Sequence, residues 1–261
     1  MPYREQNSNK GTFGKVLNVA GSENYIGAAY LSSISALKTG AGYITLAACQ
    51  KVRDAVSETL PEVVYVSRQD ALKNLDKYTV LLIGCGLSRS KSAKKDFTKF
   101  IKASKIPTVI DADGLNILSE NPCILPENTI LTPHPAEAAR LLGVNIENIL
   151  SDLEGSAKKI TEKYNCVTVL KTHRTVVCNT DFKIHINQNG NSALAKAGTG
   201  DVLAGIIAGL LAQKTELFEA AKLGVYLHSR AGEIASEELT EYSVLASDLL
   251  KYLPYAIKEL L

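Results

Sequence analysis

Short apolar segments alternate with helical segments along almost the whole chain, and this alternation limits the fold more than any other feature. Strands that alternate with helices usually pair in parallel, because each helix returns the chain to the same end of the sheet. Such strands are covered on both faces and read as continuous apolar runs. We therefore expect an α/β fold with buried strands at Val16–Ala20, Tyr43–Ala47, Val80–Ile83, Thr108–Ile110, Thr129–Leu131 and Val167–Lys171.

Helical spacing of apolar residues and local stop signals place the helices between these strands. Gly40 ends the first predicted helix, and Ser151-x-x-Glu154 has the spacing of a capping box. Near the end of the sheet, Thr175–Cys178 and Lys183–Ile186 flank a polar turn and predict an antiparallel edge hairpin. The expected helices cover Gly27–Thr39, Lys51–Thr59, Lys91–Ala103, Pro135–Leu142, Ser151–Lys163, Gly200–Gln213, Leu217–Glu238 and Ser247–Leu261.

Composition narrows the class of protein. The 261 residues are 46% hydrophobic and contain no Pro- or Ser-rich linker, which indicates one domain over residues 1–261. A net charge of +2 and the absence of Trp argue against a nucleic-acid partner. The longest apolar run, Val202–Ala212, is too short to cross a membrane, and the five cysteines form no C-x-x-C pair. We expect a reduced, soluble, cytoplasmic protein without a disulfide framework or zinc site.

Parallel sheets bind ligands beyond the carboxyl ends of their strands, so the polar segments that follow the predicted strands are the places to search. Two familiar nucleotide motifs are absent. Gly11-Thr12-Phe13-Gly14-Lys15 lacks Walker A spacing, and Gly84-Cys85-Gly86 lacks the rest of the dinucleotide fingerprint. The polar segments to examine are Gly21–Ser22, Gly84–Gly86, Asp111–Asn116, Thr132–Pro135 and Lys171–Thr175.

The strongest single signal is the run Ala197-Gly198-Thr199-Gly200-Asp201, where a glycine-rich loop meets the start of an apolar helix. Backbone N–H groups and the positive helix end make such a loop an anion site, and Gly198 and Gly200 allow close approach. Asp201 would repel a bound phosphate unless it takes a proton from a nucleophile beside it. It could equally cap the helix, and the residues alone leave both roles open.

Other polar residues at strand ends carry weaker signals. Prolines on both sides restrict the backbone around His134, whose ring could bind a ligand or make only a structural hydrogen bond. Asp111, Asp113 and Asn116 could contact a substrate, or Mg²⁺ through water, and Asp113 could instead cap the helix that follows. Lys171 could meet a phosphate or be solvated.

Taken together and in order, these segments resemble the ADP/ATP-dependent NAD(P)H-hydrate dehydratases, a branch of the ribokinase-like superfamily. The resemblance runs from about Lys10 to Leu253. It implies a three-layer sandwich with a mostly parallel central sheet and helices on both faces. The resembling segments are Lys10–Gly14, Val19–Ser22, Gly27–Leu31, Ile83–Leu87, Asp111–Asn116, Leu131–Glu137, Val169–Lys171, Gly190–Asn191 and Ala197–Asp201.

The resemblance also implies a repair reaction. Hydrated NADH or NADPH carries a hydroxyl on its reduced nicotinamide ring. ADP or ATP, with Mg²⁺ bridging its phosphates, would phosphorylate that hydroxyl, and loss of phosphate would restore NAD(P)H. Relatives of the bacterial type use ADP and release AMP and phosphate. The resemblance makes Asp201 the general base, a role worth roughly 10²–10⁴-fold in rate.

The resemblance also divides the remaining candidates between two ligands. We assign the hydrated-nicotinamide site to Ala29, Gly86, His134, Asp113, Asn116 and Asn191. We assign the nucleotide site to Lys171, Thr172, His173, Arg174, Thr175, Gly198, Thr199 and Gly200. No dedicated protein cage for a metal ion is expected.

Three positions depart from the usual family pattern. Thr172 and Ala136 stand where glycine is usual, and Cys85 stands where proline is usual. Many relatives carry an N-terminal epimerase domain, and we expect this chain to be stand-alone or trimmed and to be paired in function with an NAD(P)H-hydrate epimerase. Relatives are often tetramers, so we also expect a homo-oligomer, a homotetramer in particular.

Two alternatives stay open. A small-molecule kinase of the same superfamily, acting on a vitamin precursor such as hydroxyethylthiazole or hydroxymethylpyrimidine, would share the glycine-rich loop and Asp201. The segments Thr132–Glu137 and Lys10–Gly14 favour the dehydratase over that kinase. A non-catalytic nucleotide-binding protein would need a degraded Asp201 loop, and the loop is intact.

Overall fold

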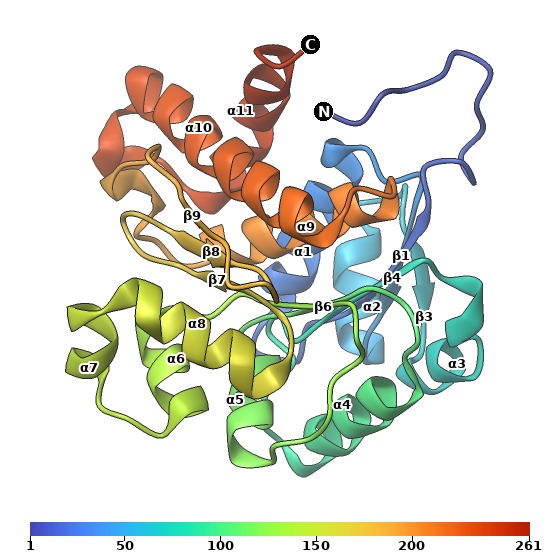
Figure 1. Ribbon diagram of the computed structural model, residues 1–261. Coiled ribbons are helices and arrows are strands. Elements are labelled where there is room, and N and C mark those ends of the chain that lie inside the picture. The colour runs from blue at the N-terminus through green and yellow to red at the C-terminus, as the bar shows by residue number, and fades with distance from the viewer.

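A nine-stranded sheet runs through the centre of the computed structural model, which describes residues 1–261 (Figure 1). The strand order is β3-β2-β1-β4-β5-β6-β7-β8-β9. Strands β1 to β7 pair in parallel, and β8 and β9 add an antiparallel hairpin at one edge. The strands are β1 (Lys15–Val19), β2 (Tyr43–Ala47), β3 (Val64–Val66), β4 (Val80–Ile83), β5 (Thr108–Ile110), β6 (Thr129–Leu131), β7 (Val167–Leu170), β8 (Val176–Cys178) and β9 (Ile184–Ile186).

Helices connect the strands and form the C-terminal part of the chain. They are α1 (Ile26–Thr39), α2 (Gln50–Ser57), α3 (Arg68–Lys73), α4 (Lys91–Ala103), α5 (Asp113–Glu120), α6 (Pro135–Leu142), α7 (Ile146–Ser151), α8 (Leu153–Tyr164), α9 (Thr199–Ala212), α10 (Leu217–Ser243) and α11 (Ala246–Lys258). Two short 3₁₀ turns are η1 (Leu75–Lys77) and η2 (Ser192–Leu194).

The predicted strands and the antiparallel edge hairpin are confirmed, and the predicted helices are confirmed with shifts of a few residues at some ends. The sequence missed β3, α3 and α7. The capping box predicted at Ser151 is wrong, because Ser151 is the last residue of α7. Asp152 caps α8 instead, where its Oδ1 accepts a hydrogen bond from Gly155 N at 2.8 Å.

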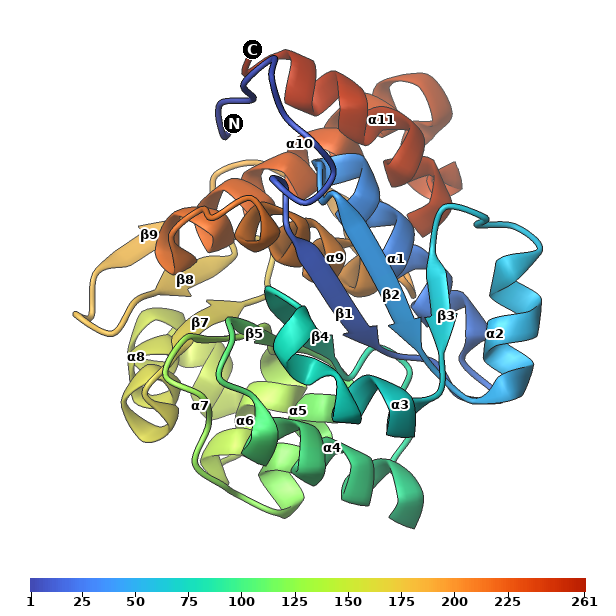
Figure 2. The same ribbon diagram turned by 90° about the vertical axis from the view of Figure 1, so that its right-hand side faces the viewer.

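Successive residues of each strand point to opposite faces of the sheet and enter two separate hydrophobic cores. In β4, Val80 and Leu82 belong to one core, and Leu81 and Ile83 belong to the other. Helices α1, α2, α9, α10 and α11 cover the first face, and α3, α4, α5, α6 and α8 cover the second. Figures 1 and 2 show the three resulting layers, with α9 to α11 on one side of the sheet and α4 to α6 on the other.

Helix α9 packs on α1 with almost no space between the two backbones. A Cβ atom added at Gly205 would lie 2.0 Å from Ser35 Oγ, and one added at Gly209 would lie 2.6 Å from Ala36 O. The small residues that recur along α9 therefore allow the close packing that their spacing predicted. This packing fixes the first turn of α9, which carries Asp201.

The chain reverses its direction of travel across the sheet between β1 and β4, which are neighbours in space. The loops that follow these two strands touch each other, since Gly21 N donates to Cys85 O at 2.8 Å. Such a switch point leaves an opening beyond the carboxyl ends of the strands. It brings the segments Gly21–Ser22 and Gly84–Gly86 to the same edge of the sheet.

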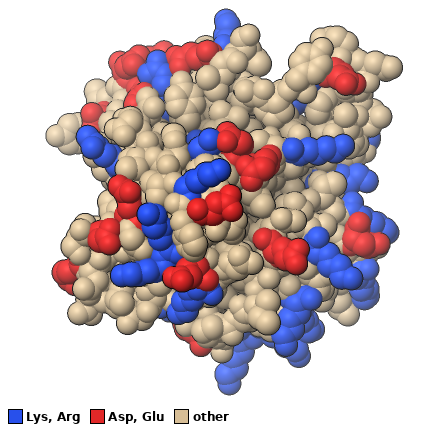
Figure 3. Space-filling view, in the orientation of Figure 1, with Lys and Arg blue, Asp and Glu red and all other residues tan.

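Acidic and basic side chains are interspersed across most of the face seen in Figure 3, in keeping with the small net charge of +2. Basic side chains are denser along its lower edge, over α4, whose sequence contains five lysines. Among the helices, none combines the length and the apolar character needed to cross a membrane.

Candidate active site

A cavity of about 680 Å³ opens beyond the carboxyl ends of the central strands, between β6, β7, the start of α9 and the middle of α10. One wall is the loop Asn189–Ser192, and another comes from Val225, His228 and Ser229 of α10. Eight residues that were predicted for the two ligand sites line this cavity together. They are His134, Lys171, Thr172, His173, Thr175, Asn191, Thr199 and Gly200.

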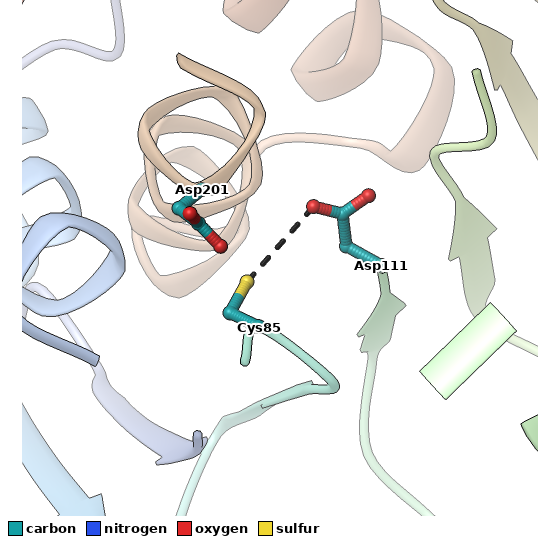
Figure 4. A group of neighbouring side chains, drawn as sticks. All are labelled: Cys85, Asp111 and Asp201. Atoms are coloured by element: carbon teal, nitrogen blue, oxygen red, sulfur yellow. Dashed lines mark hydrogen bonds between the residues drawn. The ribbon is translucent and has the colours of Figure 1, made fainter. Parts of the chain in front are cut away.

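The glycine-rich loop enters α9 through Gly198, which precedes the helix with φ of 91°. That left-handed conformation favours glycine. No side chain caps this helix, and Asp201 lies inside its first turn. The capping role left open for Asp201 is therefore wrong. Figure 4 shows its carboxylate pointing from α9 toward Cys85 and Asp111, at the ends of β4 and β5.

A buried ion pair joins Asp111 to Lys171. Lys171 Nζ lies 2.6 Å from Asp111 Oδ1, and Thr132 Oγ1 donates to the same oxygen at 2.7 Å. Burial alone would lower the pKa of Lys171, but the carboxylates of Asp111 and Glu137 outweigh it and raise the pKa above its usual value. Lys171 is therefore a charged residue in the cavity wall, and its predicted alternative as a solvated lysine is wrong.

Asp201 has no cation within ion-pair distance, because Lys171 is held by Asp111. Burial raises the pKa of Asp201 to about 7, and the neighbouring Asp111 carboxylate adds to the effect, while the nearby Cys85 thiol opposes it. Burial also raises the pKa of the Cys85 thiol, so it keeps its proton. Asp201 is thus a carboxylate that can accept a proton near neutral pH.

The side chains of Cys85, Asp111 and Asp201 lie close enough to suggest a metal site, since their ligand atoms all lie within 4.8 Å of one another. The donor set does not fit Mg²⁺. The Lys171 ammonium occupies one side of Asp111, and a protonated thiol is a poor ligand for a hard cation. Any Mg²⁺ at this site would be held by the phosphates of a bound nucleotide rather than by these three residues.

The structural hydrogen bond predicted for His134 is confirmed, and its role toward a ligand stays a prediction. Its Nδ1 accepts hydrogen bonds from Ala136 N and Glu137 N at the start of α6, and its ring also lines the cavity. Burial lowers the pKa of His134 to about 4, and the Lys171 charge contributes, so the imidazole is neutral. Glu137 completes the capping box by accepting from His134 N at 2.8 Å.

The other predicted site residues lie outside the cavity wall. Ala29 is fully buried, and Gly86 is buried against Tyr25 and Ala28. Asp113 does not cap α5 but is its first residue, and its Oδ2 accepts from Ser88 N at 2.7 Å. Asn116 Oδ1 accepts from Arg140 Nε at 2.9 Å. Arg174 and Gly198 flank the cavity without lining it.

Two features of the site were missed in the sequence. His228 is buried in α10, and its Nε2 lies 2.9 Å from Thr199 O at the start of α9. Glu233 of α10 contacts the loop at Gly190. No motif marks either residue, because each is far along the chain from its partner and only the packing of α10 brings them together.

Comparison with known proteins identifies the family. Residues 16–255 match the profile of the NAD(P)H-hydrate dehydratases. The chain belongs to the NAD(P)H-hydrate dehydratase family. The resemblance drawn from the sequence is thereby confirmed, as is the ribokinase-like fold that it implied.

Individual relatives cover most or all of this chain. The bifunctional NAD(P)H-hydrate repair enzyme of Moorella thermoacetica is 38% identical over the full chain, which spans 52% of that protein. The ADP-dependent (S)-NAD(P)H-hydrate dehydratase of Neisseria meningitidis is 38% identical over 90% of this chain and 81% of its own length. The structure of the ADP/ATP-dependent dehydratase from Bacillus subtilis, co-crystallised with ATP and Mg²⁺, superposes with a TM-score of 0.91 at 32% identity, covering 99% of this chain and 94% of that one. The chain thus spans about half the length of its bifunctional relatives and 81% to 94% of the length of the single-function ones.

Proposed function

We propose that this chain catalyses the ADP-dependent dehydration of hydrated NADH or NADPH. One observation carries the proposal: a half-buried carboxylate, Asp201, has a pKa of about 7 and lies directly after Gly200, which forms part of the cavity wall. A carboxylate beside the attacking hydroxyl can act as the general base in phosphorylation of an alcohol, and a pKa near the working pH suits that role. Family membership supplies the substrate class.

The proposed reaction places the nucleotide in the cavity and the hydrated nicotinamide on the Asp201 side of Gly200. Asp201 takes the proton of the ring hydroxyl while the hydroxyl oxygen attacks the terminal phosphorus of ADP, and AMP leaves. The C–O bond then breaks with its electron pair leaving on phosphate, a ring proton is lost, and the double bond is restored. Phosphorylation thus replaces hydroxide, a poor leaving group, with phosphate, a good one.

Charged and polar groups of the chain stabilise the transferring phosphoryl group in this proposal. Lys171 presents a fixed positive charge in the cavity wall, because Asp111 holds it and Thr132 in turn donates a hydrogen bond to Asp111. The backbone N–H group of Gly200 lies at the positive end of α9. Mg²⁺ bound to the nucleotide phosphates would supply further charge neutralisation.

The direct test is to mix the protein with purified hydrated NADH and follow the absorbance of the reduced nicotinamide. ADP and ATP are supplied in parallel reactions, and a reaction without nucleotide is the control. We expect absorbance to recover only with a nucleotide, together with AMP and phosphate when ADP is used. A stable phosphorylated product would instead indicate a kinase of the same superfamily, and no reaction with either nucleotide would contradict the proposal.

We further propose the cytoplasm as the compartment and functional pairing with an NAD(P)H-hydrate epimerase. The bifunctional enzymes of Moorella thermoacetica and Coxiella burnetii, which this chain matches over about half of their length, support the pairing. The homotetramer stays a prediction, which light scattering of the purified protein tests.

A further inference from the structure

The loop Asn187–Ser192, whose residues 189–192 form one wall of the cavity, is held in place by one face of helix α10. Residues 229, 233 and 236 of that helix share one face because they are four and three residues apart, and each accepts a hydrogen bond from the loop. The bonds join Asn187 Nδ2 to Ser229 Oγ (3.0 Å), Gly190 N to Glu233 Oε1 (2.7 Å) and Asn191 Nδ2 to Ser236 Oγ (2.6 Å). The side chain of Asn191 is therefore engaged within the protein, and its Oδ1 also accepts from Ala193 N.

The middle bond is unusual because it places a carboxylate beside a cavity that we assign to an anionic nucleotide. An uncompensated Glu233 would repel phosphates. Arg230 compensates it, with Nη1 3.1 Å from Glu233 Oε2. Arg230 is itself fixed by Glu259 just after α11, through two bonds of 2.8 Å to the two carboxylate oxygens.

The backbone conformation of Gly190 gives a reason for a side chain to hold this loop. Gly190 has φ of 109°, which a residue with a side chain rarely adopts, so its conformation is not set by local preference. A carboxylate that accepts the Gly190 N–H supplies the missing constraint, and a charge-assisted bond of this kind is stronger than a neutral one.

We propose that Glu233 is a positioning residue for the nucleotide: it holds the loop Asn187–Ser192 in the conformation that the nucleotide contacts, and Arg230 fixes the carboxylate and balances its charge. The proposal rests on the assignment of this cavity to the nucleotide. Glu233 acts through the loop and touches neither reacting group, so its loss weakens nucleotide binding and leaves the chemical step in place.

The test compares Glu233→Ala with Glu237→Ala. Glu237 lies one turn further along α10 and approaches Arg230 at 3.8 Å, but it is exposed and makes no bond to the loop. Binding of ADP is measured by calorimetry without substrate, and KM for ADP and kcat are measured in the hydrated-NADH assay. Glu233→Ala should raise Kd and KM for ADP by about tenfold or more, because it removes the charge-assisted bond from Gly190 N and the longer one from Asn189 Nδ2, with kcat within about twofold. Glu237→Ala should match the wild type.

A second variant separates positioning from general stability. Glu233→Gln keeps an oxygen that can accept from Gly190 N but loses the charge that binds Arg230, so it should restore part of the ADP affinity that Glu233→Ala loses. Equal ADP affinity in the wild type and Glu233→Ala would overturn the inference and leave the proposed function intact. A loss of kcat with unchanged KM would also overturn it. If the wild type binds neither ADP nor ATP, the proposed function fails and the inference fails with it.

Discussion

Replacing Asp201 by asparagine should abolish most of the activity and, at alkaline pH, make the protein more stable. The side-chain amide of the Asp201→Asn variant cannot take a proton, so the rate should fall at least about 10²-fold while ADP binding is kept. Burial raises the pKa of Asp201 from 3.8 to about 7, roughly three units at about 1.4 kcal/mol each. Ionising Asp201 in the folded protein therefore costs at most about 4 kcal/mol.

The sign of the stability effect follows from proton binding. The folded pKa is raised above the unfolded one, so the folded state holds the proton more tightly, and the wild type loses stability as the pH rises from about 4 to about 7. The variant has no such charge. Its Tm should exceed that of the wild type by several degrees at about pH 8, and the difference should shrink to about a quarter of that at about pH 4.5, if the fold persists there.

Asp248→Asn is the matched control, since Asp248 is a carboxylate at the start of α11 that does not line the cavity. Burial raises its pKa, but the Leu245 N–H and Lys251 outweigh this and leave it lowered. A lowered folded pKa stabilises the protein above the unfolded value, so Asp248→Asn should lower Tm at about pH 8 and leave the rate unchanged. A near-normal rate for Asp201→Asn, or a Tm difference independent of pH, would refute the reasoning for Asp201.

Three further outcomes are expected. Gly205→Ala should lower the free energy of unfolding by about 1–3 kcal/mol, because its Cβ would lie 2.0 Å from Ser35 Oγ. In Gly200→Ala the new Cβ would lie 3.4 Å from Lys171 Nζ, which is an ordinary contact distance. That variant should keep Tm within a few degrees of the wild type and should weaken ADP binding measured by calorimetry. Lys171→Met should destabilise the protein by about 3–5 kcal/mol in urea titrations at about pH 8, because it leaves Asp111 buried without its partner; adding Asp111→Asn should recover stability but not ADP binding. The wild-type kcat/KM should fall as the pH is lowered through about 7, as the general base becomes protonated, and a profile flat from about pH 6 to 8 would argue against that base.

The strands that the sequence predicted are the ones buried on both faces. Val80–Ile83 is apolar at every position and every residue of β4 is buried, so its pattern is plain. Strand β3 gave no such signal, because Val64–Val66 is a three-residue edge strand and Val64 is 49% exposed. The start of α8 was also mispredicted, because it depends on one hydrogen bond to the Asp152 side chain, and the spacing of residues in the sequence does not show which side chain makes that bond.

The site also contains features that a local sequence pattern predicts and features that depend on long-range packing. The loop Gly198–Asp201 was visible because glycines at a helix start are a local pattern with a local cause. Lys171 and Asp111 are 60 residues apart and meet only because β5, β6 and β7 pair in parallel. Because Lys171 binds Asp111, Asp201 has no cation partner. The contact of Glu233 with Gly190 depends on where α10 crosses the sheet, which the sequence does not encode in any short motif.

The central claim is that Asp201 is a base with a pKa near neutrality. A carboxyl ¹³C NMR titration of labelled protein, with Asp201→Asn used to assign the resonance, measures that pKa directly. We predict one carboxyl that titrates with a pKa of about 7, is missing in the variant, and matches the midpoint of the kcat/KM profile. A resonance from Asp201 that titrates near the ordinary aspartate value of about 4, while the rate depends on a group near neutrality, would contradict the account.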